Sequence, residues 1–225
     1  MDINGIINEV RLAIDEENVA SGARISTALS TSLVDGIRSA AKHALRWLAV
    51  NAPVVLLDGS DEIDDPGFIV TSNPETIGNT IELPDEFVRV VRVRVSSWHR
   101  AITECILDTS EEYLALSDET ATATADRPVA AIVLDNPKML ELWPYDGSAD
   151  YYGPNPEVTM TISCIPSASI SALDTPALTT KVPIPPKIHM PFIYYTAYLL
   201  LLSYKDSSAV AFRDAAITAL GLNQK

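Results

Sequence analysis

Polar and hydrophobic residues alternate in the middle of the chain, within residues 83–107. Two sets of positions fall on opposite sides of an extended backbone: Val91, Val93 and Val95 on one side, and Arg92, Arg94 and Ser96 on the other. A period of two predicts a strand with one buried face. The run 101–107 follows after a short interval, so we predict that it folds back as an antiparallel partner. Pro84, before the strand, suits the first turn of a short helical element.

Helical periodicity marks both ends of the chain. Four helices are predicted, over residues 2–15, 32–51, 190–204 and 209–220. Asp2 is placed to cap the first helix, and Ser32 with Asp35 forms a capping-box-like pair at the start of the second. The third is apolar enough to be buried, and Gly221 suits the end of the fourth.

Short apolar or alternating runs between these helices predict further strands, over 53–57, 68–71, 80–83, 128–134, 139–145 and 158–165. Residues 109–117 predict a brief helix or turn, and 166–186 predict a connection to the last helices. Helices at both ends with strands between them favour an α+β fold, with a helical bundle and a central, mainly antiparallel β domain. We expect residues 1–52 and 187–225 to form the helical domain and 53–186 the β-rich domain.

Charge is distributed unevenly along the chain. The net charge is −14, and residues 58–82 hold seven acids and no base, while residues 108–126 hold six acids and no base. Proteins that grip nucleic acid through its phosphates carry a basic surface, so this composition argues against that class. We expect the acidity to lie in two connecting regions.

Cysteines and hydropathy indicate a protein of a reducing compartment. Cys105 and Cys164 lie in apolar runs, and we expect buried free thiols in preference to a disulfide. The most apolar run, 190–204, is shorter than the roughly 20 residues that cross a bilayer, and no signal peptide precedes Asp2. We therefore expect a protein made in the cytoplasm, with no membrane partner.

Motifs of known chemistry are absent from the sequence. It contains no glycine-rich phosphate loop, no His-Glu-x-x-His, no Gly-x-Ser-x-Gly and no Cys-x-x-Cys. His43, His99 and His189 lie far apart and suggest ordinary histidines. We therefore predict no catalytic residue, no metal and no cofactor. A hydrolase with unrecognised carboxylates is the least favoured alternative.

One acidic segment has oxygen ligands of the type that hard cations prefer: Asp58, Asp61, Glu62, Asp64 and Asp65. It departs from the helical calcium-loop pattern, because Ile63 occupies the place where that loop needs glycine. We therefore interpret these five residues as an acidic channel or partner loop, and not as a metal site.

Arginines surround one tryptophan in the central stretch. Arg92, Arg94 and Arg100, with Arg89, flank Trp98 within twelve residues. Three interpretations remain open: a nucleic-acid surface, a solvated strand face, or ion pairing with an acidic loop of a neighbouring subunit. We favour the pairing. Arg38, Lys42 and Arg46 on the second predicted helix are interpreted as a solvated face.

Aromatic residues gather near a predicted loop: Trp143, Tyr145, Tyr151 and Tyr152. Such residues are enriched at protein interfaces, although a core position for Trp143 is an equal alternative. As a competing function, the same aromatics suggest a soluble ligand- or carbohydrate-binding module, which predicts a monomer with an exposed aromatic cleft.

The order of short motifs resembles a known family. An N-terminal helix pair is followed by Leu83-Pro84-Asp85-Glu86-Phe87 and the Val/Arg strand, then by Trp98-His99-Arg100-Ala101-Ile102, Tyr113, Arg127-Pro128-Val129-Ala130, Leu140-Glu141-Leu142-Trp143-Pro144, Val158-Thr159-Met160-Thr161-Ile162 and Tyr194-Tyr195-Thr196-Ala197-Tyr198-Leu199-Leu200. This set, over most of residues 1–222, resembles the head–tail adaptor (connector ring, or tail tubular) proteins of short-tailed phages, including the ring proteins of crAss-like phages.

The resemblance implies a structural virion protein at the head–tail junction, made in the host bacterial cytoplasm. Such proteins form a ring, commonly of twelve copies, that docks beneath the portal, continues the DNA channel and meets tail or further ring proteins. Genomic DNA then passes transiently through the ring. In this setting, the residues expected at a subunit or partner interface are Arg92, Arg94, Trp98, Arg100, Trp143 and Tyr145, and the acidic segment 58–65 is expected to line the channel.

Overall fold

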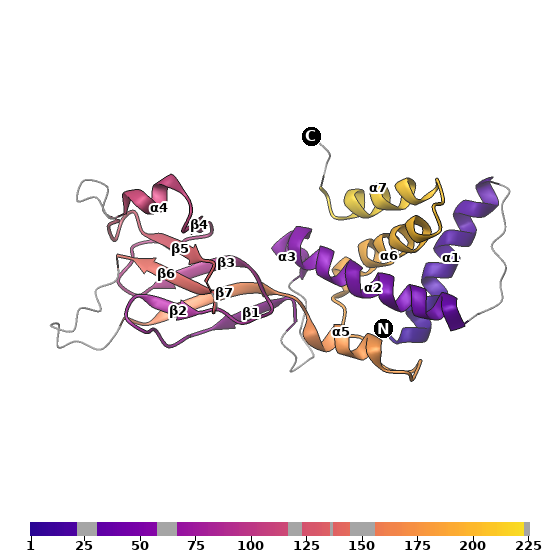
Figure 1. Cartoon of the computed structure of the whole chain (residues 1–225), viewed down its shortest axis with the longest axis horizontal. Coiled ribbons are helices and arrows are strands. Elements are labelled where there is room, and N and C mark those ends of the chain that lie inside the picture. The colour runs from indigo at the N-terminus through magenta and orange to yellow at the C-terminus, as the bar shows by residue number, and fades with distance from the viewer. Residues whose placement is uncertain (22–30, 58–66, 117–122, 136, 145–155, 223–225) are drawn as a thin grey trace. The chain divides into compact units, whose positions relative to one another are not determined.

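The computed structural model describes residues 1–21, 31–57, 67–116, 123–135, 137–144 and 156–222 (Figure 1). The chain divides into two compact units. The helical unit comprises Met1–Phe68 and Ile165–Lys225, and the β unit comprises Ile69–Cys164. The expected α+β class is confirmed, because the N- and C-terminal helices pack together in one unit and mostly antiparallel sheets form the other. The expected helical domain (1–52 and 187–225) and β-rich domain (53–186) stay a prediction, because a domain is defined by its ability to fold on its own.

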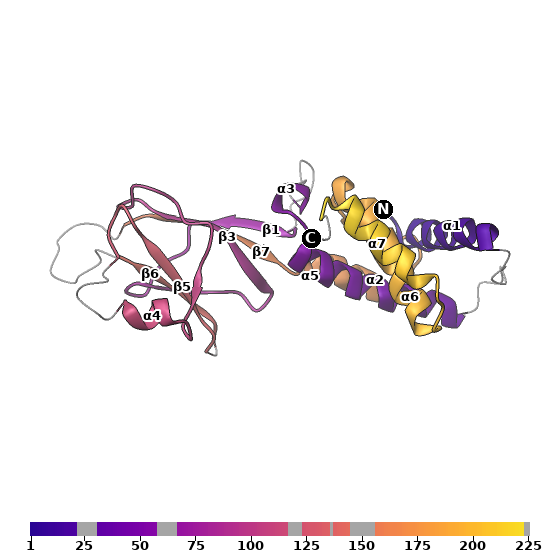
Figure 2. The same ribbon diagram turned by 90° about the horizontal axis from the view of Figure 1, so that it is seen from above.

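The helical unit contains six α-helices and one 3₁₀ turn in its described residues: α1 (Ile3–Ser21), α2 (Thr31–Asn51), α3 (Val54–Leu57), α5 (Ser167–Asp174), η1 (Pro186–Ile188), α6 (His189–Ser203) and α7 (Ala209–Ala219). Helix α6 packs against α1, α2 and α7 (Figure 2). Three helices around one helix explain why α6 is apolar on nearly every side. Phe192, Ile193 and Ala197 are almost completely buried, as the hydropathy of this run predicted.

Helix ends follow the local chemistry of the sequence. The Gly5 amide donates to Oδ1 of Asp2 at 2.7 Å, which confirms the predicted cap of α1. Helix α1 is longer than expected and ends at Ser21, whereas α2 begins at Thr31, one residue before the predicted start. After α7, Gly221 has φ 70°, the left-handed conformation that glycine adopts without a steric penalty.

Two expectations for the helical unit are wrong. The run 53–57 is not a strand, because Val54–Leu57 forms the helical turn α3, and short apolar runs do not distinguish the two structures by period. The run 166–186 is more than a connection, because it contains α5. Tertiary contacts hold this helix in place, since Leu173 is buried and the Ser169 hydroxyl donates to the Pro183 carbonyl at 2.6 Å.

The described residues of the β unit form two sheets. The first has the order β1 (Ile69–Ser72), β7 (Val158–Cys164), β3 (Phe87–Val95), and all its pairs are antiparallel. The second has the order β2 (Thr80–Glu82), β6 (Met139–Trp143), β5 (Val129–Val133), β4 (Ile106–Leu107), and only the β4–β5 pair is parallel. The short helix α4 (Glu111–Ala115) lies between β4 and β5 in the sequence.

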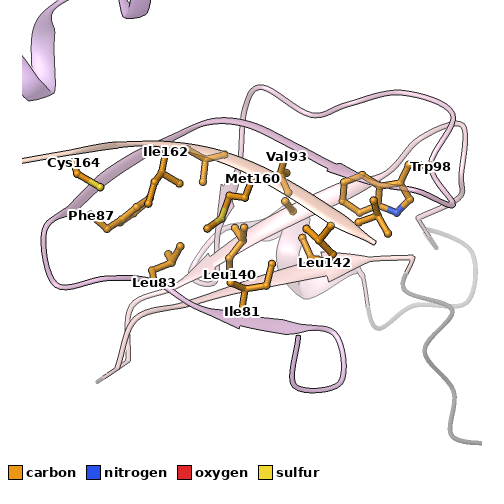
Figure 3. Close-up of a cluster of buried hydrophobic side chains, with 14 residues drawn as sticks. Ile81, Leu83, Phe87, Val93, Trp98, Leu140, Leu142, Met160, Ile162 and Cys164 are labelled. Atoms are coloured by element: carbon orange, nitrogen blue, oxygen red, sulfur yellow. The ribbon is translucent and has the colours of Figure 1, made fainter. Parts of the chain in front are cut away.

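Side chains from both sheets form one hydrophobic core (Figure 3). Val93, Met160 and Ile162 come from the first sheet, and Leu140 and Leu142 come from the second. Because successive side chains of a strand point to opposite faces, the alternate residues of these strands lie on the outer faces of the sandwich.

The predicted pairing of 101–107 with the central strand is limited to one bridge. Val93 and Ile102 exchange two backbone hydrogen bonds of 2.9 and 2.8 Å. The chain then crosses to the second sheet, where β4 pairs with β5. The segment around Pro84 is also corrected: it forms a turn closed by the Phe87 amide and the Pro84 carbonyl at 2.9 Å, and not a helical element.

Candidate functional site

A row of arginines follows the outer face of the first sheet. Strand β3 pairs with β7 so that Arg89 lies opposite Ser163, Arg92 opposite Thr161 and Arg94 opposite Thr159. The inward positions pair separately, as Phe87 with Cys164, Val90 with Ile162, Val93 with Met160, and Val95 with Val158. We call Arg92, Arg94, Thr159, Thr161 and Thr71 the arginine face.

Two shifts in register place the three arginines together. The pairing skips Val88 and Val91, in the manner of β-bulges. Arg89 and Arg92 are three residues apart, so an unbroken strand would direct them to opposite faces. The prediction that Val91 shares the inward face with Val93 and Val95 is therefore corrected, since Val90 has that position.

The arginine face is exposed, and two of its hydroxyls lie within hydrogen-bond distance of each other. Within the described part of the chain, Arg92 and Arg94 are exposed and make no ion pair. Thr71 Oγ1 and Thr161 Oγ1 lie 3.0 Å apart, which joins β1 to β7 on this side. Glu157, just before β7, is the acidic group at one end of the face, where its amide donates to Ser96 Oγ at 3.1 Å.

The aromatic residues expected at an interface occupy different environments. Trp98 is only 2 % exposed, belongs to the core, and donates from Nε1 to the Pro144 carbonyl at 2.8 Å. Its ring is therefore not on the surface, although Arg100 nearby is exposed. Trp143 is half-buried at the end of β6. Tyr145, Tyr151, Tyr152 and the acidic residues Asp58, Asp61, Glu62, Asp64 and Asp65 lie outside the described residues.

Carboxylates gather on the other side of the β unit, around Tyr113 of α4. The Tyr113 hydroxyl donates to Glu141 Oε2 at 3.0 Å. Burial raises the pKa of Tyr113, and the hydrogen bond to Glu141 and the negative charges of Glu141, Asp108 and Asp135 raise it further. Exposed Glu111 and Glu112 open the same helix, which Ser110 caps through the Tyr113 amide at 3.2 Å. We call Asp108, Glu111, Glu112, Asp135 and Glu141 the carboxylate patch.

The arginine face and the carboxylate patch lie on opposite outer faces of the sandwich. In the first sheet, Val93 points into the core, so its neighbours Arg92 and Arg94 point outward. In the second sheet, Leu140 and Leu142 point into the core, so Glu141 between them points outward. The sequence showed the alternation around Glu141, but only the fold brings Glu141 beside Asp108 and Asp135.

Other candidate groups have structural partners. Lys42 forms an ion pair with Asp174, and Arg38 donates to the Pro176 carbonyl at 3.0 Å. The expected solvated face of α2 is therefore partly wrong, because these two side chains join α2 to α5 and the segment after it. Among the histidines, His43 is exposed, His99 Nδ1 lies 2.6 Å from Asp126 Oδ1, and His189 Nε2 lies 3.3 Å from Glu9 Oε2.

Both cysteines are free thiols, as expected, but only Cys164 is buried, whereas Cys105 is half-buried. Burial raises the pKa of Cys105 to about 12, and burial together with Glu86 raises the pKa of Cys164 to about 11. Both are therefore protonated near neutral pH and unreactive as nucleophiles. Within the described ranges, no three His, Cys, Asp or Glu side chains are arranged to hold a metal ion. No described helix is long and apolar enough to cross a membrane.

In the described part of the chain, the candidate site thus consists of two charged surfaces, the arginine face and the carboxylate patch. The family model of the SU10 adaptor protein matches residues 1–225, the whole chain. A comparison with curated proteins finds no match. Because the family match covers every described element of both units, the chain belongs to the SU10 adaptor protein family of phage head–tail adaptors, virion proteins with a non-enzymatic role that bind other virion proteins.

Proposed function

We propose that this protein forms a ring between the portal and the tail of a phage and continues the DNA channel from one to the other. The observation that carries the proposal is the adaptor-family match over the full chain. The ring commonly has twelve copies in the proteins that the sequence resembles. In this proposal the protein contacts further copies of itself, the portal, and tail or further ring proteins.

Exposed apolar side chains in the helical unit support a partner-binding role. Most of α6 is covered by the chain's own helices, but Leu202 and Tyr204 at its end are exposed, and so is Val210 at the start of α7. Exposed apolar side chains that lie close together favour contact with another protein. We propose that this end of the helical unit contacts the portal or a neighbouring copy.

Electron microscopy of the natural particle tests the proposal. We expect a ring of density beneath the portal whose subunits accommodate the 24.4 kDa chain and fit the helical and β units separately. As a control, the same imaging of particles that lack this protein should show the portal without that ring. Absence of the protein from purified virions, or density for it at another position, would contradict the proposal.

The acidic segment 58–65 supports a further part of the proposal, that it lines the DNA channel. Five carboxylates repel phosphate, so DNA passes without adhering to the wall. Replacement of Asp58, Asp61, Glu62, Asp64 and Asp65 by Asn or Gln should slow or stall genome ejection from assembled particles, measured as DNA release after receptor addition. Normal ejection kinetics from particles carrying the variant would refute this role.

The alternative of a ligand- or carbohydrate-binding module is less well supported. It depends on Trp143, Tyr145, Tyr151 and Tyr152, of which Trp143 is half-buried and the three tyrosines lie outside the described residues. The adaptor-family match favours a role in virion assembly.

A further inference from the structure

We propose that neighbouring copies in the ring meet through the β unit, with the arginine face of one copy against the carboxylate patch of the next. The inference rests on the proposed ring and specifies which surfaces meet. Its occupant is a second copy of this chain, and three observations support it: the scarcity of bases in the β unit, the opposite placement of the two charged faces, and the chemistry of the groups on them.

Within the β unit, the few basic residues are concentrated in one stretch. Residues 69–164 hold sixteen acids and six bases, and four of those bases are arginines between residues 89 and 100. The register of β3 brings Arg92 and Arg94 onto one exposed face with neutral threonines around them. A surface of this kind is complementary to an acidic partner, and any second copy of this chain, at a net charge of −14, offers one.

Because the arginine face and the carboxylate patch lie on opposite sides of the β unit, the contact between two copies joins two different surfaces. If two copies met through the same surface, arginine would face arginine or carboxylate would face carboxylate, which repels. A contact between different surfaces leaves one arginine face and one carboxylate patch free, so a third copy can add in the same way. Such heterologous contacts close into rings when the rotation between copies permits.

The groups on the two faces suit a direct contact. The guanidinium of arginine binds carboxylates through two parallel N–H donors, and Glu111 and Glu112 are exposed on α4. Leu114, on the same helix, and Leu134, beside Asp135, are 66 % and 58 % exposed. They offer an apolar surface for the aliphatic stems of the arginines. The acidic group on the arginine face itself is Glu157 at its end, so its centre has no competing carboxylate among the described residues.

A complementary pair of charge-reversal variants tests the contact. The first variant carries Arg92→Glu and Arg94→Glu, and the second carries Glu111→Lys and Glu112→Lys, all at exposed positions. Assembly of each full-length protein is measured with the purified portal, by light scattering and electron microscopy. A control variant, Arg46→Glu with Lys181→Glu, makes the same charge change as the first variant at exposed positions of the helical unit.

We expect each variant alone to lose assembly, because both remove the attraction and create a repulsion between adjacent copies. An equimolar mixture should assemble again, since the reversed arginine face of the first variant then meets the reversed carboxylate patch of the second, and the native pair of faces forms at alternate contacts. The control should assemble normally. Circular dichroism of each variant should match the wild type, because exposed substitutions leave the core unchanged.

The outcomes separate this inference from the proposed ring. If wild-type protein forms rings on the portal and both variants also do so, the ring stands and the contact is refuted. Loss of assembly that mixing does not restore also refutes a contact between these two faces. If wild-type protein forms no ring, the proposed function fails, and the contact fails with it. Salt-sensitive binding of duplex DNA by wild-type protein, lost in the Arg92→Glu, Arg94→Glu variant that still assembles, would instead assign the arginine face to nucleic acid.

Discussion

Two tryptophans of the β unit differ in what their indole N–H groups meet. Trp98 is buried and donates to the Pro144 carbonyl at 2.8 Å. Trp143 is half-buried, but its Nε1 atom is buried and has no hydrogen-bond partner in the described part of the structure. A buried donor without an acceptor costs free energy, whereas a satisfied donor stabilises the fold. The two side chains therefore contribute differently to stability despite their similar chemistry.

We predict opposite effects of the same substitution at these two positions. Trp98→Phe should lower the free energy of unfolding by about 1–3 kcal/mol, because it removes core contacts and leaves the Pro144 carbonyl without its donor. Trp143→Phe should be neutral or slightly stabilising, because it removes an unpaired donor. Urea unfolding followed by circular dichroism measures both. Equal destabilisation by the two substitutions would contradict this account.

At the scale of elements, the two register shifts of β3 decide which side chains face out. Val91 is skipped in the pairing with β7, so that Val90 and Val93 both point into the core although they are three residues apart. Arg92 follows the shift and points outward. Because each residue alternates with the next along a strand, adding or removing one residue reverses the face of every residue on one side of the change.

Deletions in β3 should therefore have unequal effects. Without Val91, Val90 and Val93 point into the core and Arg92 between them points outward, as in a strand without a bulge. All remaining residues of β3 keep the face that they have in the wild type. We expect stability within about 2 kcal/mol of the wild type, the range of ordinary substitutions. Without Val93, Arg92 moves to a core position, and the unpaired buried charge should cost more than about 4 kcal/mol. Thermal unfolding compares the two variants. If the Val91 deletion destabilises the protein as much as the Val93 deletion does, the bulge itself is required for the stability of the fold.

At the scale of the whole molecule, the chain leaves the helical unit and returns to it through adjacent strands. Ile69 at the start of β1 pairs with Ser163 near the end of β7, so the two ends of the β unit lie side by side. The β unit also has a hydrophobic core of its own. Neighbouring ends and a separate core are typical of a domain that tolerates excision.

We predict that residues 69–164 fold when expressed alone. The fragment should give dispersed amide signals in NMR spectra and a cooperative unfolding transition. A shorter fragment, 69–150, is the control. It lacks β7, the central strand of the first sheet, and should not fold. An unfolded 69–164 fragment would mean that the β unit depends on the rest of the chain for stability, and would also count against the expected β-rich domain.

Local structure that repeats over several turns or several alternations follows from the order of amino acids. The periodic patterns predicted the four long helices, the strands β3, β5, β6 and β7, the cap at Asp2 and the α+β class, because each depends on a period of side chains or on a neighbour in the chain. The order of short motifs also pointed to the adaptor family. These features can be predicted without knowing which segments are in contact in the folded protein.

Contacts between distant segments account for the rest. They place β4 in the second sheet, bury Trp98, and shift the register that gathers the arginines. They also bring Glu141, Asp108 and Asp135 together around Tyr113, although these carboxylates come from separate segments of the sequence. In each case, the stabilising free energy comes from burial against, or strand pairing with, residues far away in the sequence. A local pattern of residues does not show which distant segment will be the partner.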